Sequence, residues 1–257
     1  MLLILAPSKG QNFDGPVPKV QLTLPALLEH TKELAALLKQ MSPDELMQLM
    51  KIRSPLAKTT QQRFADFHLP FTQDNARPAI LTFTGTMYEA IDFASLQARG
   101  YRYLQEHLRI LSGFYGCLRP FDLMQPYRLE MQTRLSTDRG DTLYRFWGPL
   151  ITEELNTALS SLRTPLLVNL ASTEYFRAII GKQLNAPVLR ITFKEVDARG
   201  ARVVAMYSKR ARGLMARFAV EEQLKDPQGL KDFTSGGYRF SPKLSTEGEW
   251  VFTRPRS

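Results

Sequence analysis

LRILSGFYGCLRPFDLMQPYRLEM, residues 108–131, places charged side chains in a stretch that is otherwise rich in aromatic and aliphatic residues. Three arginines lie in it: Arg109, Arg119 and Arg128. A hydrophobic core does not need arginines, and a solvated loop does not need so many apolar side chains. Gly113 and Gly116 mark a tight turn within the stretch. A half-buried scaffold that holds the arginines at one place satisfies both facts, so we interpret residues 108–131 as one wall of an anion-binding cleft.

The bulk composition points to a folded protein with a polyanionic partner. The chain has 257 residues, of which 44% are hydrophobic, and it carries a formal net charge of +9 with a sequence pI near 9.7. This balance suggests nucleic acid, phosphorylated ligands or an anionic surface as the partner. The single cysteine, Cys117, excludes an intramolecular disulfide, and the apolar opening MLLILAP is too short for a signal peptide or a membrane span. We therefore expect a cytoplasmic protein without a membrane partner.

Most of the net positive charge lies in one segment. Residues 177–217 contain ten Lys or Arg and two acids, a surplus of eight. The alternative is that these charges are scattered over solvated faces of strands and helices, and that alternative stays open.

Periodicity and breaker residues predict a mixed α/β fold, an α+β arrangement in which a mixed β-sheet is flanked by helices. Ser42-Pro43-Asp44-Glu45 is a capping box with proline at the first helical position. Predicted helices cover residues 25–39, 54–64, 101–111, 152–162 and 208–224, and predicted strands cover 79–83, 165–170, 187–193 and 202–207. The segments 238–240 and 250–252 suggest a C-terminal hairpin. No linker is apparent, so we expect a single domain over residues 1–257.

The predicted helix after Ser208 carries a cationic cluster. Its apolar stripe packs on the core, whereas four cations lie off that stripe: Lys209, Arg210, Arg212 and Arg217. Positive charge in a first turn opposes the helix dipole, by roughly 0.3–1 kcal/mol per residue, and the free N–H groups there favour an anion. We expect a phosphate site at this helix start, with solvated charges or salt bridges as the alternative.

Further polar residues follow the two most apolar strands. Ser8 and Lys9 come just after the first strand, where α/β folds commonly place ligand-contacting groups. Asn169, Ser172 and Glu174 occupy a similar place after residues 165–170. Glu174 could act as a general base or pair with one of the arginines, and pairing is the more common role for a lone carboxylate in so basic a chain.

The sequence offers no cofactor motif. His30, His68 and His107 are far apart and lack the spacing of a metal-ligand set. No P-loop, dinucleotide-binding glycine motif or nucleophilic triad signature is present. We expect neither a metal nor another cofactor.

Three motifs together resemble the YaaA family of bacterial peroxide-stress resistance proteins: HLRILSGFYGCLRPFDLMQPYRLEM at 107–131, NLASTEYF at 169–176 and KRARGLMAR at 209–217. The opening LLILAPSKG is also similar to the family's LILISPAKT, so the resemblance spans nearly the whole chain. The resemblance implies a protein that lowers free iron and limits oxidative damage under hydrogen peroxide. It further implies an α/β fold with a positively charged cleft and a helix-hairpin-helix-like element, for which a DNA-binding role has been suggested.

Carried onto this chain, the helix-hairpin-helix-like element falls on the segment from the 101–111 helix through Ser112 to Leu118, with Gly113 and Gly116 as the hairpin turn. The common form of this turn has its glycines two residues apart, and here they are three apart. The residues expected to bind DNA phosphates are Lys9, Arg109, Arg119, Arg128, Lys209, Arg210, Arg212 and Arg217. Ser8, Asn169, Ser172 and Glu174 are expected to add polar groups to the cleft.

Two main classes of function are consistent with these features. The first is non-specific binding of double-stranded or distorted DNA by a protein expected to be monomeric, through backbone contacts. The second is an enzyme that acts on a phosphorylated or nucleotide-like small molecule in the same cleft. A weaker third is a regulatory protein whose basic face meets an acidic partner. A deep, narrow cleft would favour the enzyme, and a broad basic groove would favour DNA.

Overall fold

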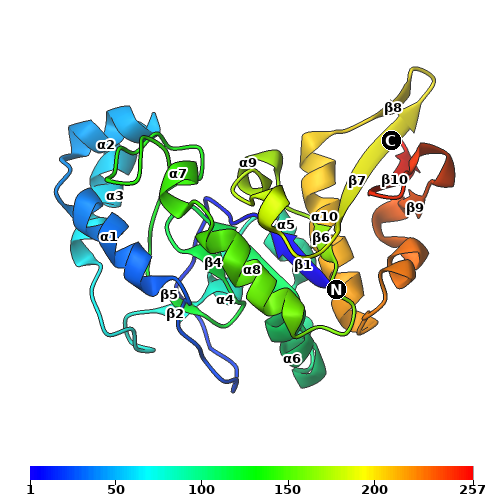
Figure 1. The fold of residues 1–257 in the computed structure, drawn as a ribbon, viewed down its shortest axis with the longest axis horizontal. Coiled ribbons are helices and arrows are strands. Elements are labelled where there is room, and N and C mark those ends of the chain that lie inside the picture. The colour runs from blue at the N-terminus through cyan, green and yellow to red at the C-terminus, as the bar shows by residue number, and fades with distance from the viewer. Residues whose placement is uncertain (257) are drawn as a thin grey trace.

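The computed structural model describes residues 1–256, and its centre is an eight-stranded mixed sheet (Figure 1). Its strands run in the order β4-β3-β1-β6-β7-β10-β9, and β8 pairs with the far part of β7. The strands of this sheet are β1 (Leu2–Leu5), β3 (Leu108–Ser112), β4 (Gly116–Leu118), β6 (Leu167–Asn169), β7 (Val188–Asp197), β8 (Gly200–Arg202), β9 (Arg239–Phe240) and β10 (Glu249–Pro255). A separate antiparallel pair joins β2 (Arg77–Pro78) to β5 (Leu123–Met124).

Ten helices lie around these strands within residues 1–256. They are α1 (Leu28–Lys39), α2 (Pro43–Met50), α3 (Ser54–Asp66), α4 (Ala79–Thr82), α5 (Thr86–Ile91), α6 (Ala98–His107), α7 (Leu143–Trp147), α8 (Leu150–Ser160), α9 (Thr173–Phe176) and α10 (Ala205–Glu221). Helices α1, α2 and α3 gather at one end of the molecule, and β7 to β10 lie at the other (Figure 1). The expected mixed α/β class is confirmed.

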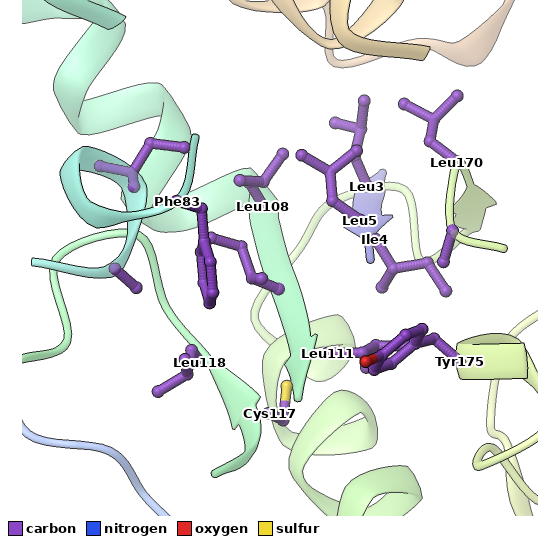
Figure 2. Close-up of a cluster of buried hydrophobic side chains, with 14 of the residues drawn as sticks. Leu3, Ile4, Leu5, Phe83, Leu108, Leu111, Cys117, Leu118, Leu170 and Tyr175 are labelled. Carbon is purple, nitrogen blue, oxygen red and sulfur yellow. The ribbon is translucent and has the colours of Figure 1, made fainter. Parts of the chain in front are cut away.

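The middle of the sheet is parallel and buried on both faces. Strand β1 pairs in parallel with β3 on one side and with β6 on the other, with Leu3 opposite Leu108 and Val168. All four residues of β1 are buried, which is why the opening of the chain reads as a continuous apolar run. Figure 2 shows this core, with Leu3 and its neighbours between Leu108 and Leu170.

The strand order reverses at β1. The chain runs from β1 to β3 on one side and later returns to β6 on the other side of β1, so the carboxyl ends of β1 and β6 meet at a topological switch point. Open α/β sheets bind ligands in the crevice that such a reversal creates. The loops that follow these two strands are therefore the first place to look for a site.

Three predicted elements are wrong: the strand at 79–83, the end of the helix at 101–111 and the strand at 202–207. Residues 79–82 of the predicted strand 79–83 form the short helix α4, in which the hydroxyl of Thr82 donates a hydrogen bond to the carbonyl of Pro78, and the strand pairing is made just before it by β2. The helix predicted over 101–111 ends at His107, since residues 108–112 join the sheet beside β1. The strand predicted over 202–207 is replaced by the start of α10 at Ala205.

The expected helix-hairpin-helix-like element is also wrong for residues 112–118. Strands β3 and β4 form an antiparallel hairpin, with Ser112 opposite Gly116. Gly113 lies at its turn because a Cβ there would come 2.4 Å from the carbonyl oxygen of Leu129. The two glycines thus serve a β-turn packed against residues 129–130, and no helical hairpin exists at this place.

Other predictions are confirmed. Ser42 and Glu45 form the reciprocal capping box at the start of α2, and α3 begins at Ser54 as expected. The apolar run at 165–170 contains the buried strand β6. The C-terminal hairpin pairs Phe252 of β10 with Phe240 of β9.

Candidate functional site

A pocket of about 360 Å³ lies at the switch point of the sheet. We call it the switch-point pocket; it is lined by the loop after β1, residues 127–130, residues after β6 and the first turns of α10. Its charged residues are Lys9, Arg128, Glu130, Glu174, Lys209 and Arg212. Ser8 and Ser172 also line it, as the sequence predicts for polar residues that follow two neighbouring parallel strands.

Close packing of two helices brings α10 to the pocket. A Cβ at Gly213 would lie 2.1 Å from the carbonyl oxygen of Met87 in α5, so glycine at this position allows the two backbones to approach. Met87 and Arg212 both line the switch-point pocket. The small residue therefore sets the position of the arginine beside it.

Glu130 pairs with two cations of the pocket. Its Oε1 accepts from the Lys9 ammonium at 2.9 Å and from Nη2 of Arg128 at 3.3 Å. The Glu130 and Arg128 side chains are only 22% and 16% exposed, so their ion pair is shielded from solvent more than a surface pair is, whereas Lys9 is exposed. The pair with Glu130 holds Arg128 at the wall of the switch-point pocket.

The two cations that α10 contributes have no ionic partner among residues 1–256. Lys209 is exposed, whereas Arg212 is half-buried and its Nε is buried without a hydrogen-bond partner. Burial lowers the pKa of Arg212. The Nε of Arg128 is likewise buried without a partner. Buried guanidinium donors that make no hydrogen bond are costly, and an anion in the pocket would satisfy them.

Glu174 supplies a carboxyl group whose pKa is raised. Burial is the main cause, and the nearby Glu130 carboxylate adds to it, whereas the Gln132 backbone N–H and Lys9 oppose it. The hydrogen bond from the Gln132 N–H to Oε1 of Glu174 is 3.2 Å long. A carboxyl group in this environment can accept a hydrogen bond from a ligand or carry a proton. No direct ion pair joins Glu174 to an arginine among residues 1–256, so the pairing that the sequence favoured is absent there.

A second pocket, of about 430 Å³, adjoins the first. We call it the hairpin pocket; it is lined by residues 48–51 at the end of α2, by residues 132–134, and by Arg128 and Glu130. Because Arg128 and Glu130 line both pockets, the two depressions are neighbours. The hairpin pocket adds Lys51 and Arg134, which brings the cations of the two pockets to six against the two carboxylates Glu130 and Glu174.

A helical hairpin borders the second pocket. Helices α2 and α3 are joined by three residues, 51–53, and Lys51 adopts a left-handed backbone conformation with φ of 52°. Lys51 and Arg53 are exposed, and no side chain caps the start of α3. The predicted site did not include this element, although two helix-start signals only twelve residues apart, at Ser42 and Ser54, were present to indicate it.

Four of the eight predicted phosphate-binding cations lie in the switch-point pocket: Lys9, Arg128, Lys209 and Arg212. Arg109 is buried, and its Nη1 donates to the carbonyls of Gln105 and Leu108. Arg119 pairs with Asp122 at 3.0 Å and lines a different depression together with Arg109. The stretch 108–131 therefore contributes Arg128 alone, of its three arginines, to the wall of the pocket.

Three other predicted site residues, Arg217, Arg210 and Asn169, also lie outside the switch-point pocket. Arg217 donates to the carbonyls of Ile91 and Asp92 and pairs with Glu221. Arg210 is exposed and does not line the switch-point pocket. Asn169 lines another depression, which shares Arg212 with the switch-point pocket and also contains Arg190 and Lys194, and its side chain accepts from the Ala171 N–H.

The phosphate site predicted at the helix start rests on a wrong helix boundary. Helix α10 begins at Ala205, so Lys209, Arg210 and Arg212 lie beyond its first turn and do not oppose the helix dipole as expected. The three residues also differ in whether they reach the switch-point pocket: Lys209 and Arg212 line it, and Arg210 does not.

Two further features concern metals and membranes. Within residues 1–256, no group of three or more His, Cys, Asp or Glu side chains is arranged to hold a metal ion. Over the same residues, no helix combines the length and the apolar character needed to cross a membrane.

Comparison with known proteins gives one family. The sequence model of a family described as "Peroxide stress protein YaaA" matches residues 1–244. A UPF0246 protein of Acaryochloris marina is 49% identical over 254 residues, covering 99% of this chain and 100% of the relative. UPF0246 proteins of Chromobacterium violaceum and Colwellia psychrerythraea are 46% and 43% identical, over 100% of each chain.

Proposed function

The chain belongs to the YaaA family of peroxide stress proteins, and from this premise we propose that it binds DNA without sequence preference through its two adjoining pockets. One observation carries the proposal: the switch-point pocket and the hairpin pocket share Arg128 and Glu130, and six cations against two carboxylates line them. We regard the two pockets as one basic groove. Such a surface matches the phosphate backbone, which supplies most of the affinity in non-specific binding.

The helical hairpin gives the groove a way to hold a phosphate. The backbone N–H groups in the first turn of α3 have no side-chain cap, and helix N-termini bind phosphate through such groups. Lys51 and Arg53 are exposed at the same turn. We assign the helix-hairpin-helix-like element implied by the family resemblance to α2 and α3, in place of residues 112–118.

Binding of this kind predicts a steep dependence on salt. If about four phosphates are neutralised, affinity for a duplex should fall roughly a hundredfold between 50 and 200 mM salt. The expected contacts are to the backbone, because the groove cations come from several loops and helices and not from one exposed recognition helix.

The test is fluorescence anisotropy of a labelled duplex over a salt series. Replacing Lys51, Arg53 and Arg134 together by alanine should reduce the slope of log K against log salt by nearly three. The control variant replaces Lys39, Arg199 and Lys243, which are equally cationic and exposed but line neither pocket. An equal loss of slope in both variants, or no binding at low salt, would contradict the proposal.

The stress role is proposed on the family alone. Covering DNA would shield it from oxidants made near bound iron, and the resemblance adds a lowering of free iron. We assign the iron effect to no residue, because the described residues contain no cluster suited to a metal ion.

A second candidate function is an enzyme that acts on a phosphorylated or nucleotide-like small molecule. The location of the switch-point pocket favours it, since parallel α/β folds place their substrates at such a reversal of strand order. The raised pKa of Glu174 also suits a group that transfers protons.

A further inference from the structure

The switch-point pocket differs from the hairpin pocket in ways that point to a small ligand. It lies between the loops after β1 and β6, and its 360 Å³ falls at the small end of the range for ligand pockets, roughly 300–1,000 Å³. A volume of this size can enclose a small molecule, whereas a duplex could only lie across its mouth. The pocket could therefore bind a small ligand, in addition to any contact that it makes with the DNA phosphate backbone.

Its unpaired cations call for an anion. Arg212 carries a buried Nε without a hydrogen-bond partner, and Lys209 has no ionic partner among residues 1–256. Glu130 pairs with Lys9 and Arg128, and no ion pair joins it to Arg212 or Lys209 among residues 1–256. A phosphate would satisfy the Arg212 donors with charge-assisted hydrogen bonds.

The other residues that line the pocket suit chemical groups that a free phosphate ion lacks. Glu174 presents a half-buried carboxyl group that accepts from the Gln132 N–H and has further acceptor sites for hydroxyl or N–H donors of a ligand. Met87, Leu129 and Tyr175 add apolar and aromatic surface to the same pocket. A ligand that matches all three parts carries a phosphate, hydrogen-bond donors and a flat aromatic ring whose faces can contact apolar side chains.

We propose that the switch-point pocket binds a nucleoside 5′-monophosphate, with its phosphate on Arg212 and Lys209 and its donors on Glu174. This inference deepens the second candidate function, whose substrate class it names, and it does not depend on duplex binding. Arg212 is the anchor, because its guanidinium is held beside the pocket by the close approach of α10 and α5 at Gly213.

The experiment is isothermal titration calorimetry of the full chain with four probes: deoxyadenosine monophosphate, thymidine monophosphate, deoxyadenosine and inorganic phosphate. We expect at least one monophosphate to bind, and both deoxyadenosine and inorganic phosphate to bind at least about tenfold more weakly than it does. No heat from either monophosphate at millimolar concentration would overturn the proposal. Inorganic phosphate that binds as tightly as the monophosphates would also overturn it, because the pocket would then be an ion site only.

Three single variants locate the phosphate. Arg212→Ala and Lys209→Ala should each weaken monophosphate binding by about tenfold to a hundredfold, the range expected for a lost charge-assisted hydrogen bond. Arg210→Ala is the matched control, since it removes the same charge from the same helix outside the pocket. Lys209 is exposed, so its variant tests the proposal even if Arg212→Ala does not fold. Equal weakening in Arg210→Ala would refute the assignment.

The DNA proposal can fail separately. The variant that lacks Lys51, Arg53 and Arg134 should keep its full affinity for the monophosphate, whatever happens to duplex binding, because these residues do not line the switch-point pocket. Loss of monophosphate binding in that variant would contradict the nucleotide site. A change only in the salt dependence of its duplex binding would bear on the DNA proposal and leave the nucleotide site untouched.

Discussion

Arg212 and Arg217 lie on the same helix, α10, yet they use their charge in opposite ways. Arg217 donates to the carbonyls of Ile91 and Asp92 at 2.9 Å and pairs with Glu221 at 2.8 Å. Arg212 lines the switch-point pocket with a buried Nε that no group of residues 1–256 satisfies. A paired arginine contributes to stability, whereas an unpaired one at a pocket costs stability and is available to a ligand.

The same contrast divides the arginines of residues 108–131. Arg119 is bound to the buried Asp122, while Arg128 faces both pockets. Internal pairing therefore distinguishes Arg217 from Arg212 on α10, whereas Arg128 pairs with Glu130 and still lines both pockets.

The largest effect on stability should come from removing the partner of a paired arginine. Asp122 is 1% exposed and accepts from the Thr23 hydroxyl, the Arg119 N–H and Nε of Arg119. Asp122→Ala should lower the free energy of unfolding by about 2–4 kcal/mol, because three donors lose their charged acceptor. Urea denaturation measures this, with the exposed Asp74→Ala expected within about 0.5 kcal/mol of the parent. A loss below about 1 kcal/mol for Asp122→Ala would mean that this pair is not structural.

A matched pair on α10 sharpens the contrast. Arg217→Ala should lower the free energy of unfolding by about 1.5–3 kcal/mol, because it removes hydrogen bonds from a charged donor to two backbone carbonyls and a carboxylate. Arg212→Ala should cost less than about 0.5 kcal/mol, since its buried Nε makes no hydrogen bond that folding would lose. Thermal and urea unfolding of both variants give the comparison. If Arg212→Ala proved the more destabilising, Arg212 would belong with the structural arginines.

Part of this division could be predicted from the sequence. Local signals predicted the capping box at Ser42, the buried strand β6 and the polar residues Ser172 and Glu174 that follow it, because each depends on neighbouring residues. The mixed α/β class followed from the same kind of pattern.

What the sequence could not predict depends on partners that are distant along the chain. Arg217 is bound by carbonyls more than 120 residues away, and residues 108–112 form a strand because β1 lies beside them. The helical pattern at 101–111 correctly predicts a helix up to His107. Beyond His107, pairing with β1 determines the structure, and residues 108–112 form a strand. The α2–α3 hairpin was missed as a site because its signals were interpreted only as helix starts.

The smallest predicted effect concerns the acid on the unpaired side, Glu174. Its pKa is raised, mainly by burial and further by Glu130, so folding disfavours the charged form. The cost is present when the carboxyl is ionised in both states, at neutral pH, and it vanishes when both states are protonated, below the ordinary Glu pKa of about 4.3. Glu174→Gln should therefore raise Tm near neutral pH and leave it unchanged at about pH 3. Differential scanning fluorimetry at the two pH values measures this, with the exposed Glu247→Gln as control. A lower Tm for Glu174→Gln at neutral pH would show that the charged carboxylate stabilises the fold. Glu174 would then belong with the paired groups, and the contrast between the pocket and the rest of the protein would not extend to its acids.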